Sequence, residues 1–202
     1  MKNPVSLIFP NFFETNTFFI DEKVGMFKFS NAYKVYDAQG EIGMISQRLT
    51  AGQKILRLMV KKAMLPFKLE IIDLEGEVLV TLNRGWTFWM SKIVLTNGNG
   101  DLLGSIKQRF VFLKPTFKIF DENEKTIATI SGDWKGWNFS IKNDNGNHIG
   151  TITKKWNGIL KEAFTTADKY VVDIVPEFAE DTRKMAIVAC AITIDMVLKE
   201  SK

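Results

Sequence analysis

The chain has 202 residues, of which 46% are hydrophobic and 25% charged, and its formal net charge is +4. These proportions exclude a disordered chain and provide enough apolar side chains for a sizeable core. The mild positive charge falls well short of that of a dedicated nucleic-acid binder, so we expect no nucleic-acid partner. The single cysteine, Cys190, excludes an internal disulfide and favours a reducing compartment.

Residues 1–13 lack the pattern of a secretory signal peptide. They contain one early lysine, and prolines and an asparagine interrupt their apolar run. A signal peptide needs a basic start followed by a continuous apolar segment. We therefore expect a cytoplasmic protein.

A recurring unit of strand, Asp/Asn-x-x-Gly turn and strand occupies most of the chain. The turns begin at Asp37, Asp73, Asn97 and Asn143, and a fifth turn at Asp121 lacks the glycine. Aspartate or asparagine at the first position and glycine at the fourth are typical of type I turns. The last four starts are separated by about 24, 24 and 22 residues, which predicts a meander of β-hairpins.

The sequence flanking these turns alternates with the period of a strand. Phe117 and Ile119, for example, fall on one parity of their segment, as in a half-buried strand. Residues 50–65 differ, because their apolar side chains recur near helical spacing between a candidate N-cap, Thr50, and a stop at Pro66. We expect about a dozen strands, this helix and a second helix at the C-terminus.

The C-terminal segment 185–198 is apolar except for Thr193 and Asp195. A bilayer span takes roughly 20 mostly apolar residues, and an aspartate at its centre costs about 2.5 kcal/mol or more. Apolar side chains on every face of a helix must be surrounded by protein or lipid, and we expect protein. The helix side chains that we expect in the centre of the protein are Met185, Ile187, Val188, Cys190, Ile192 and Asp195.

The strands and the apolar helix together predict one architecture. A sheet of about twelve strands tends to close, because closure removes its exposed edges. A barrel of that size has a lumen too wide for strand side chains alone to fill. We therefore expect a mostly β (α+β) protein, a closed antiparallel barrel around a buried C-terminal helix, with residues 1–202 as one domain.

The last fifty or so residues carry a series of short motifs. These are Lys154 or Lys155 with Trp156 and Gly158, then Glu162-Ala163-Phe164-Thr165 and Ala167-Asp168, and finally Ala189-Cys190 and Ile194-Asp195. In this order they resemble the C-terminal half of phospholipid scramblases. The wider group includes the plant LURP-one-related proteins and tubby C-terminal domains. The resemblance implies a barrel of about twelve strands around a central helix.

The resemblance also implies a membrane- or lipid-associated protein. Its expected activity is ATP-independent, bidirectional movement of phospholipid, at a site peripheral to the inner face of the plasma membrane. The alternative is a soluble tubby-like module that binds a lipid or a protein and transports nothing. A third hypothesis, a tubby-style phosphoinositide or nucleic-acid reader, requires a denser basic patch than this chain shows.

Some scramblases carry a proposed calcium loop that starts with aspartate at the position of Thr166. In this chain the first carboxylate is missing, the middle positions are apolar, and the remaining candidates are Asp168, Asp173 and Glu177. Calcium needs six to eight oxygen ligands. We therefore expect no cofactor, with calcium as the alternative, and we interpret residues 169–175 as a strand leading into the helix.

Basic and aromatic residues are the candidates for contact with a membrane. Candidate anionic-surface contacts are Lys61, Lys62, Lys154, Lys155 and Lys161; clustered on one face, each adds about 1 kcal/mol of attraction to anionic lipid. The tryptophans near strand ends form either an interfacial belt or part of the barrel packing, and we favour packing; they are Trp86, Trp89, Trp134, Trp137 and Trp156.

Residues for covalent catalysis or metal binding are scarce. The only histidine, His148, follows a turn and has no cysteine or second histidine at ligand spacing. A Ser-His-Asp site would need this histidine, and Cys190 lies on the apolar helix, where a thiol is usually inert. We therefore expect a protein that is not an enzyme and binds no metal through His or Cys.

Overall fold

The computed structural model describes residues 11–22, 32–48, 65–86, 92–111, 114–133, 135–154, 169–178 and 181–200. Within these ranges the chain forms twelve strands, one short 3-10 helix and one α-helix. In chain order the elements are η1 (Asn11–Phe13), β1 (Thr17–Glu22), β2 (Ala32–Tyr36), β3 (Glu41–Arg48), β4 (Phe67–Asp73), β5 (Val78–Arg84), β6 (Lys92–Asn97), β7 (Leu102–Val111), β8 (Lys114–Phe120), β9 (Thr126–Asp133), β10 (Asn138–Asn143), β11 (His148–Thr153), β12 (Lys169–Ile174) and α2 (Asp181–Glu200).

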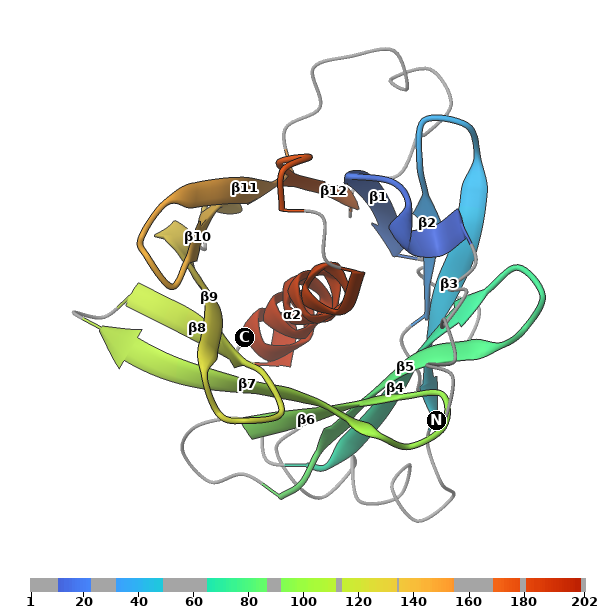
Figure 1. Ribbon diagram of the computed structural model, residues 1–202, viewed down its shortest axis with the longest axis horizontal. Helices are drawn as coiled ribbons and strands as arrows, with labels where there is room; N and C mark the ends of the chain where they lie inside the picture. Colours follow the sequence, from blue (N-terminus) through green and yellow to red (C-terminus); the bar gives the residue numbers. More distant parts are fainter. Residues whose placement is uncertain are drawn as a thin grey trace, which may run out of the picture.

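The strands form a closed barrel, in agreement with the predicted architecture (Figure 1). Each strand pairs antiparallel with the strands before and after it in the chain, and β1 pairs with β12 to close the ring. The closing register places Thr17 opposite Asp173 and Ile20 opposite Tyr170. Among the twelve described strands, closure leaves no edge unpaired, which removes the usual template for edge-to-edge association.

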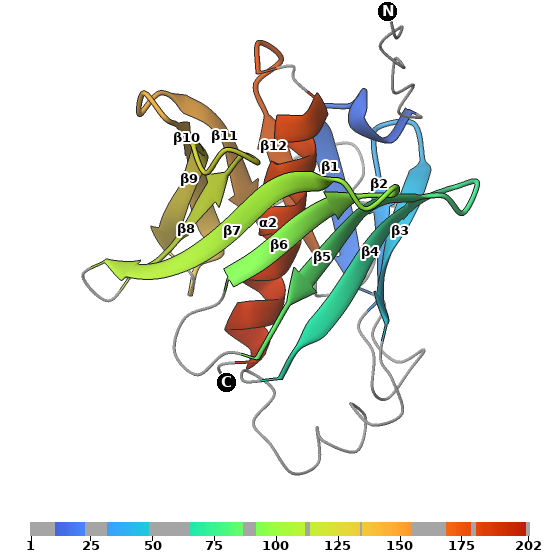
Figure 2. The same cartoon turned by 60° about the horizontal axis from the view of Figure 1, so that its bottom comes forward.

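Helix α2 lies inside the barrel, as Figures 1 and 2 show from two directions. All its described side chains from Lys184 to Val197 are buried. Its small residues Ala186, Ala189 and Ala191 take up little of the lumen, while large side chains fill the space from the wall. The largest buried wall residues are Phe18, Tyr33, Phe117, Phe139 and Tyr170. The predicted protein-enclosed helix is confirmed.

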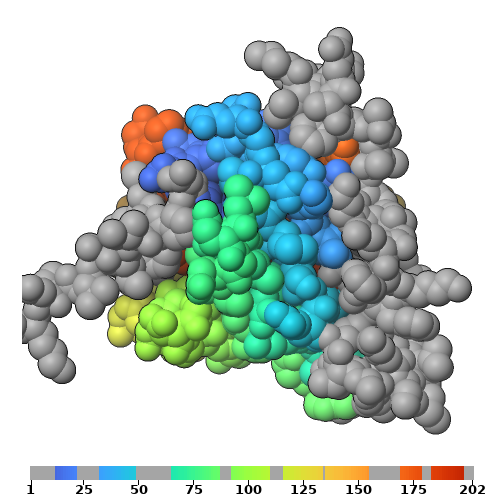
Figure 3. Space-filling model, turned by 90° about the vertical axis from the view of Figure 1, so that its right-hand side faces the viewer, coloured from blue at the N-terminus to red at the C-terminus, as the bar shows by residue number. Residues whose placement is uncertain are grey.

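The wall around α2 is made by strands with one face turned inward. In β2 the buried residues Tyr33 and Val35 alternate with less buried neighbours, as expected for a half-buried strand. On the side drawn in Figure 3, segments from the first half of the chain, coloured blue to green, form a continuous surface. On this side the sheet therefore separates the helix from solvent (Figure 3).

The five Asp/Asn turns all lie at the end of the barrel where α2 begins, because connections in an antiparallel meander alternate between the two ends. In three of them the glycine at the fourth position has a positive φ, and its N–H donates to the carbonyl oxygen of the first residue. These glycines are Gly76, Gly100 and Gly146, with φ of 89°, 90° and 82°. We call this end of the barrel, with the five turns at 37–40, 74–77, 98–101, 121–125 and 144–147, the turn end.

The fifth turn keeps the same geometry without the glycine. Glu124 occupies the fourth position with φ of 61°, and its N–H donates to the carbonyl oxygen of Asp121 at 3.2 Å. The Asp121 carboxylate also accepts hydrogen bonds from the backbone N–H groups of Asn123 and Lys125. These local bonds offset the cost of the left-handed conformation at a residue with a side chain.

The helix predicted at 50–65 lies outside the described residues, except for its last position. Leu65 is 3% exposed and precedes β4 by one residue, Pro66. The assignment of residues 1–202 to one domain stays a prediction.

Candidate functional site

A buried hydrogen bond joins α2 to the barrel wall. The Tyr33 hydroxyl donates to Oδ2 of Asp195 at 2.9 Å, and both residues are at most 1% exposed. Tyr33 reaches the lumen because β2 turns this position inward. Leaving a buried polar group without a hydrogen-bond partner lowers the free energy of unfolding by about 1–3 kcal/mol, and by more when the group is a charged carboxylate. The acidic residue of the apolar run therefore fixes the rotation of α2 relative to β2.

A second polar contact holds α2 where the helix begins. Lys184 is 4% exposed, and its Nζ donates to the carbonyl oxygen of Phe13 in η1 at 3.3 Å. The ring centroids of Phe12 and Phe13 are 4.7 Å apart, and both rings lie within 6.4 Å of Phe18 on β1. This aromatic cluster and η1 cover the interior at the turn end, where the Lys184 side chain is buried.

The other central helix residues that the sequence singles out are packed among wall side chains. Met185, Ile187, Val188, Cys190 and Ile192 are all 0% exposed. Burial raises the pKa of the Cys190 thiol far above its ordinary value, because a thiolate is poorly stabilised in apolar surroundings. The cysteine is therefore a packing residue in this structure.

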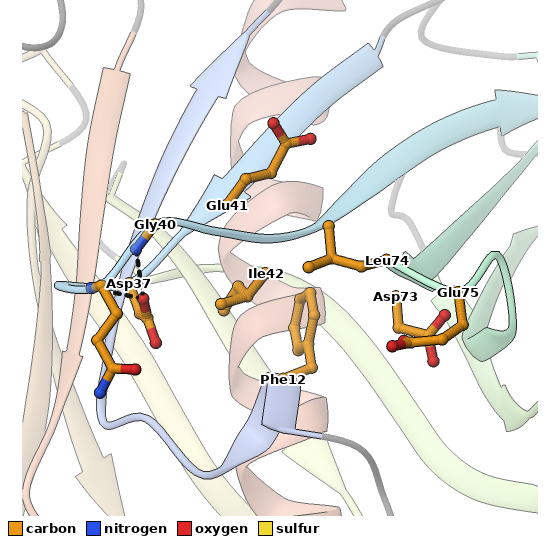
Figure 4. Close-up of a pocket in the computed structure, with 9 residues that line it drawn as sticks. Phe12, Asp37, Gly40, Glu41, Ile42, Asp73, Leu74 and Glu75 are labelled. Atoms are coloured by element: carbon orange, nitrogen blue, oxygen red, sulfur yellow. Dashed lines mark hydrogen bonds between the residues drawn. The ribbon is translucent and has the colours of Figure 1, made fainter.

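A cavity of about 330 Å³ opens at the turn end, between the turns before β3 and β5. Figure 4 shows the Phe12 ring within it and acidic side chains around it, namely Asp37, Glu41, Asp73 and Glu75. Asp37 accepts a hydrogen bond from the N–H of Gly40 at 3.0 Å, and Asp73 accepts one from the N–H of Glu77 at 2.8 Å. These two carboxylates stabilise their own turns.

Acidic groups in the described part of the chain are not arranged as ligands. No group of three or more His, Cys, Asp or Glu side chains among the described residues could hold a metal ion. Of the calcium candidates, Asp168 lies outside the described residues. Asp173 is exposed on β12 and accepts a hydrogen bond from the Thr17 hydroxyl at 2.8 Å, and Glu177 is exposed in the turn that follows. Calcium binding stays an untested alternative.

The opposite end of the barrel carries aromatic and basic side chains. Trp137 packs on Tyr170 with ring centroids 5.5 Å apart, and the Lys154 ammonium lies 4.5 Å from the Trp137 ring centroid. Trp86, which follows β5, is 54% exposed. The predicted packing role therefore holds for Trp137 and is wrong for Trp86, because β5 ends at Arg84 and the chain continues beyond the sheet.

Most of the sequence-predicted surface residues fall outside the described ranges. These are Lys61, Lys62, Lys155 and Lys161, together with Trp89, Trp134 and Trp156. His148 is the first residue of β11, exposed and next to the turn that precedes it.

Among the helices in the described part of the chain, none has both the length and the apolar content that a transmembrane span requires.

The family model described as Scramblase matches residues 20–201, from β1 to the end of α2. The chain belongs to the scramblase family. The match covers the second half of β1, all of β2 to β12 and the central helix, so the resemblance of the C-terminal motifs extends to nearly the whole barrel. No solved structure matches this scramblase-family chain.

Several named relatives are similar to this scramblase-family chain. Human phospholipid scramblase 1 is 30% identical over 150 residues, which cover 67% of this chain and 47% of the relative. Human phospholipid scramblase family member 5 is 26% identical, with 65% and 54% covered. A phospholipid scramblase family protein of Schizosaccharomyces pombe is 21% identical, with 71% and 40% covered. The chain spans about half the length of the curated relatives it matches.

Sequence reasoning identified Asp195 as unusual but did not find its partner. Tyr33 lies 162 residues away in the chain, and the only signal is that it is one of three tyrosines, on a strand that alternates. Lys184 was also missed, because a lysine near the start of a helix is usually exposed. Its burial follows from η1, which no sequence pattern predicted.

Proposed function

We propose that this chain is a phospholipid scramblase-like protein that associates with membranes and supports ATP-independent, bidirectional movement of phospholipid between leaflets. The observation that carries the proposal is the family match from β1 to α2. Relatives whose names describe phospholipid scramblases support it, at 21% to 30% identity.

The enclosed helix favours a lipid path along the outside of the barrel. The side chains of α2 that would contact lipid in a span are fully buried against the wall, and two polar contacts hold the helix at both ends. Exchanging these contacts for hydrocarbon would expose Asp195 and Lys184 to a medium in which charged groups are costly. In our proposal the lipid headgroup therefore moves over the outer surface, and the helix stays in place.

The proposed activity requires neither covalent chemistry nor a cofactor. A lipid that moves between leaflets down its concentration gradient needs a path for its headgroup, and no covalent bond is made or broken. We propose a cytoplasmic protein, peripheral to the inner face of the plasma membrane. In this proposal calcium has no strong effect, because the first loop position, Thr166, offers a hydroxyl in place of a carboxylate.

A lipid-bleaching assay tests the proposal. The full chain is added to vesicles that contain a nitrobenzoxadiazole-labelled phospholipid, and dithionite then bleaches the label in the outer leaflet. We expect label from the inner leaflet to become accessible faster than in protein-free vesicles, without ATP and equally with calcium or with a chelator. Heat-unfolded protein at the same concentration is the matched control.

Two results would count against the proposal in different ways. A rate equal to that of protein-free vesicles, with protein bound to them, would leave a lipid-binding module without transport. Lipid movement that occurs only with calcium would overturn the proposed calcium independence. It would favour Asp168, Asp173 and Glu177 as calcium ligands.

A further inference from the structure

The turn end of the barrel is acidic. The five turns at 37–40, 74–77, 98–101, 121–125 and 144–147 contain eight acidic residues and one basic residue, Lys125. Removing these from the totals of 23 acidic and 27 basic residues leaves 15 and 26 for the rest of the chain. A mildly basic protein therefore has one strongly acidic end, and its positive charge lies elsewhere.

The opposite end of the barrel presents basic side chains to solvent. Arg48, the last residue of β3, and Lys68 on β4 have side chains that are 67% and 47% exposed. Their partner Glu70 is only 8% exposed, so the cations lie outermost. Further around the ring, Arg109 near the end of β7 and Lys135 before β10 are exposed.

Aromatic side chains accompany these cations. Trp86 is 54% exposed just beyond β5, and Lys154 lies over the half-buried Trp137 ring. Figure 2 shows that α2 ends at the same end of the barrel as β3 and β5. We call the described residues Arg48, Lys68, Trp86, Arg109, Lys135 and Lys154 the basic end.

We propose that the basic end is the surface that docks on anionic phospholipid, with the C-terminal end of α2 toward the membrane and the acidic turn end away from it. The inference rests on the proposed function and deepens it by assigning the contact surface. Basic residues near a membrane are attracted to anionic headgroups, and exposed tryptophan favours the interface. The acidic turns would be repelled by the same lipids, so charge disfavours the opposite orientation.

Lipid fits this surface better than a nucleic acid does. The cations are spread around the rim over β3, β4, β7, β10 and β11. A planar anionic surface can contact a whole rim, whereas nucleic-acid binding uses a denser patch or stripe of basic residues. The exposed Trp86 is also suited to an interface that is polar on one side and apolar on the other.

Two charge-reversal variants of the full chain test the surface. Arg109→Glu with Lys135→Glu changes the basic end, and Lys125→Glu with Lys142→Glu makes the same change in net charge at or near the turn end, with all four residues exposed. Binding is measured by flotation with vesicles containing about 30% phosphatidylserine in phosphatidylcholine. We expect the first variant to bind at least about tenfold more weakly than the second. Thermal unfolding checks that both variants fold.

A fluorescent label reports the orientation independently of charge. Trp86→Cys and Leu74→Cys place a single reactive thiol at the basic end and at the turn end, where Leu74 is 63% exposed. The native Cys190 is buried and does not compete for the reagent. An environment-sensitive dye at position 86 should shift to shorter emission wavelengths when vesicles are added, and the same dye at position 74 should not.

The outcomes separate this inference from the proposed function. Equal weakening by both charge variants, or a dye shift at position 74 instead of 86, overturns the docking surface and leaves lipid association standing. No flotation of the unsubstituted chain overturns both. Binding of a short DNA duplex that Arg109→Glu with Lys135→Glu abolishes, without vesicle binding, overturns the assignment of the basic end to lipid.

Discussion

Polar side chains in the lumen determine how α2 sits in the barrel. Asp195 accepts from Tyr33 at 2.9 Å, Thr193 donates to the Ala189 carbonyl oxygen at 2.9 Å, and Lys184 donates to η1. An apolar helix alone could rotate or slide with little penalty. The Thr193 bond lies within the helix, but Asp195 and Lys184 must keep partners outside it, so these two contacts select one rotation and one depth.

The Tyr33 hydroxyl is therefore expected to contribute to stability. Tyr33→Phe removes a donor to a buried carboxylate and keeps the ring, so the free energy of unfolding should fall by about 1–3 kcal/mol. Denaturant unfolding followed by circular dichroism measures the change. Tyr36→Phe, on the less buried face of the same strand, is the control and should lose less. An equal fall in the free energy of unfolding for the two variants would show that the hydrogen bond to Asp195 does not stabilise the protein.

A buried carboxylate on the outer wall predicts a pH dependence. Glu70 accepts from Arg48 Nε at 2.8 Å and from Lys68 Nζ at 2.9 Å. Burial by itself raises the pKa of this carboxyl group, but the hydrogen bonds from Lys68 and Arg48 outweigh it and hold the pKa below its ordinary value. A group whose pKa is lowered on folding stabilises the protein above its unfolded pKa, and that contribution is lost as the pH falls through the folded pKa.

Glu70→Gln should thus be less stable than the unsubstituted chain at neutral pH, and the difference should shrink as the pH falls through the carboxyl range. Urea unfolding at a series of pH values measures the difference. Glu75→Gln, exposed in a turn, should show a smaller difference. A Glu70→Gln deficit that stays constant with pH would contradict the assigned role of the ion pairs.

At the scale of elements, close approach between strands decides where glycine is required. A Cβ on Gly43 of β3 would lie 2.4 Å from the Ile72 carbonyl oxygen on β4 and 2.9 Å from the Phe12 ring. Ile72 lies in the wall strand that pairs with β3, and Phe12 lies in η1, which covers the turn end. The sheet and η1 therefore depend on the absence of a side chain at this position.

Gly43→Ala should push β3 away from β4 and from η1. Overpacking of this kind costs about 1–3 kcal/mol, and a lower melting temperature in thermal unfolding would report it. Gly85→Ala is the matched control, because a Cβ there has nothing within 4 Å. A melting temperature of Gly43→Ala equal to that of the control would mean that the strands separate without cost.

At the scale of the whole molecule, the architecture could be predicted because two sequence signals constrain each other. Turns such as those starting at Asp73 and Asn97 recur at a steady spacing and give antiparallel hairpins. The apolar run around Cys190 needs an enclosure, and a closed sheet in the same chain supplies it. An internal position was favoured over a bilayer span because Asp195 makes a span costly.

The buried polar contacts and the surfaces were harder to predict than the apolar core. Nothing local links Tyr33 to Asp195 or Lys184 to Phe13, because those contacts depend on the register of the whole ring. The prediction that Trp86 packs was wrong. The alternation of side chains along a strand shows which face is buried, but it does not show at which residue the strand ends. Acidic turns and basic strand ends lie at opposite ends of the barrel because successive connections alternate between the two ends. The acidic residues of the turn sequences could therefore have predicted this separation.

The central claim is that α2 stays inside its own barrel when the protein meets lipid. Cys190 is the only cysteine and lies fully buried in the middle of α2, so its reaction with a membrane-permeant maleimide is the most direct test. We predict no modification of the native chain, with or without phosphatidylserine-containing vesicles, and complete modification after unfolding in denaturant. Rapid modification of the folded protein when vesicles are added would show that the helix leaves the barrel and would contradict the account.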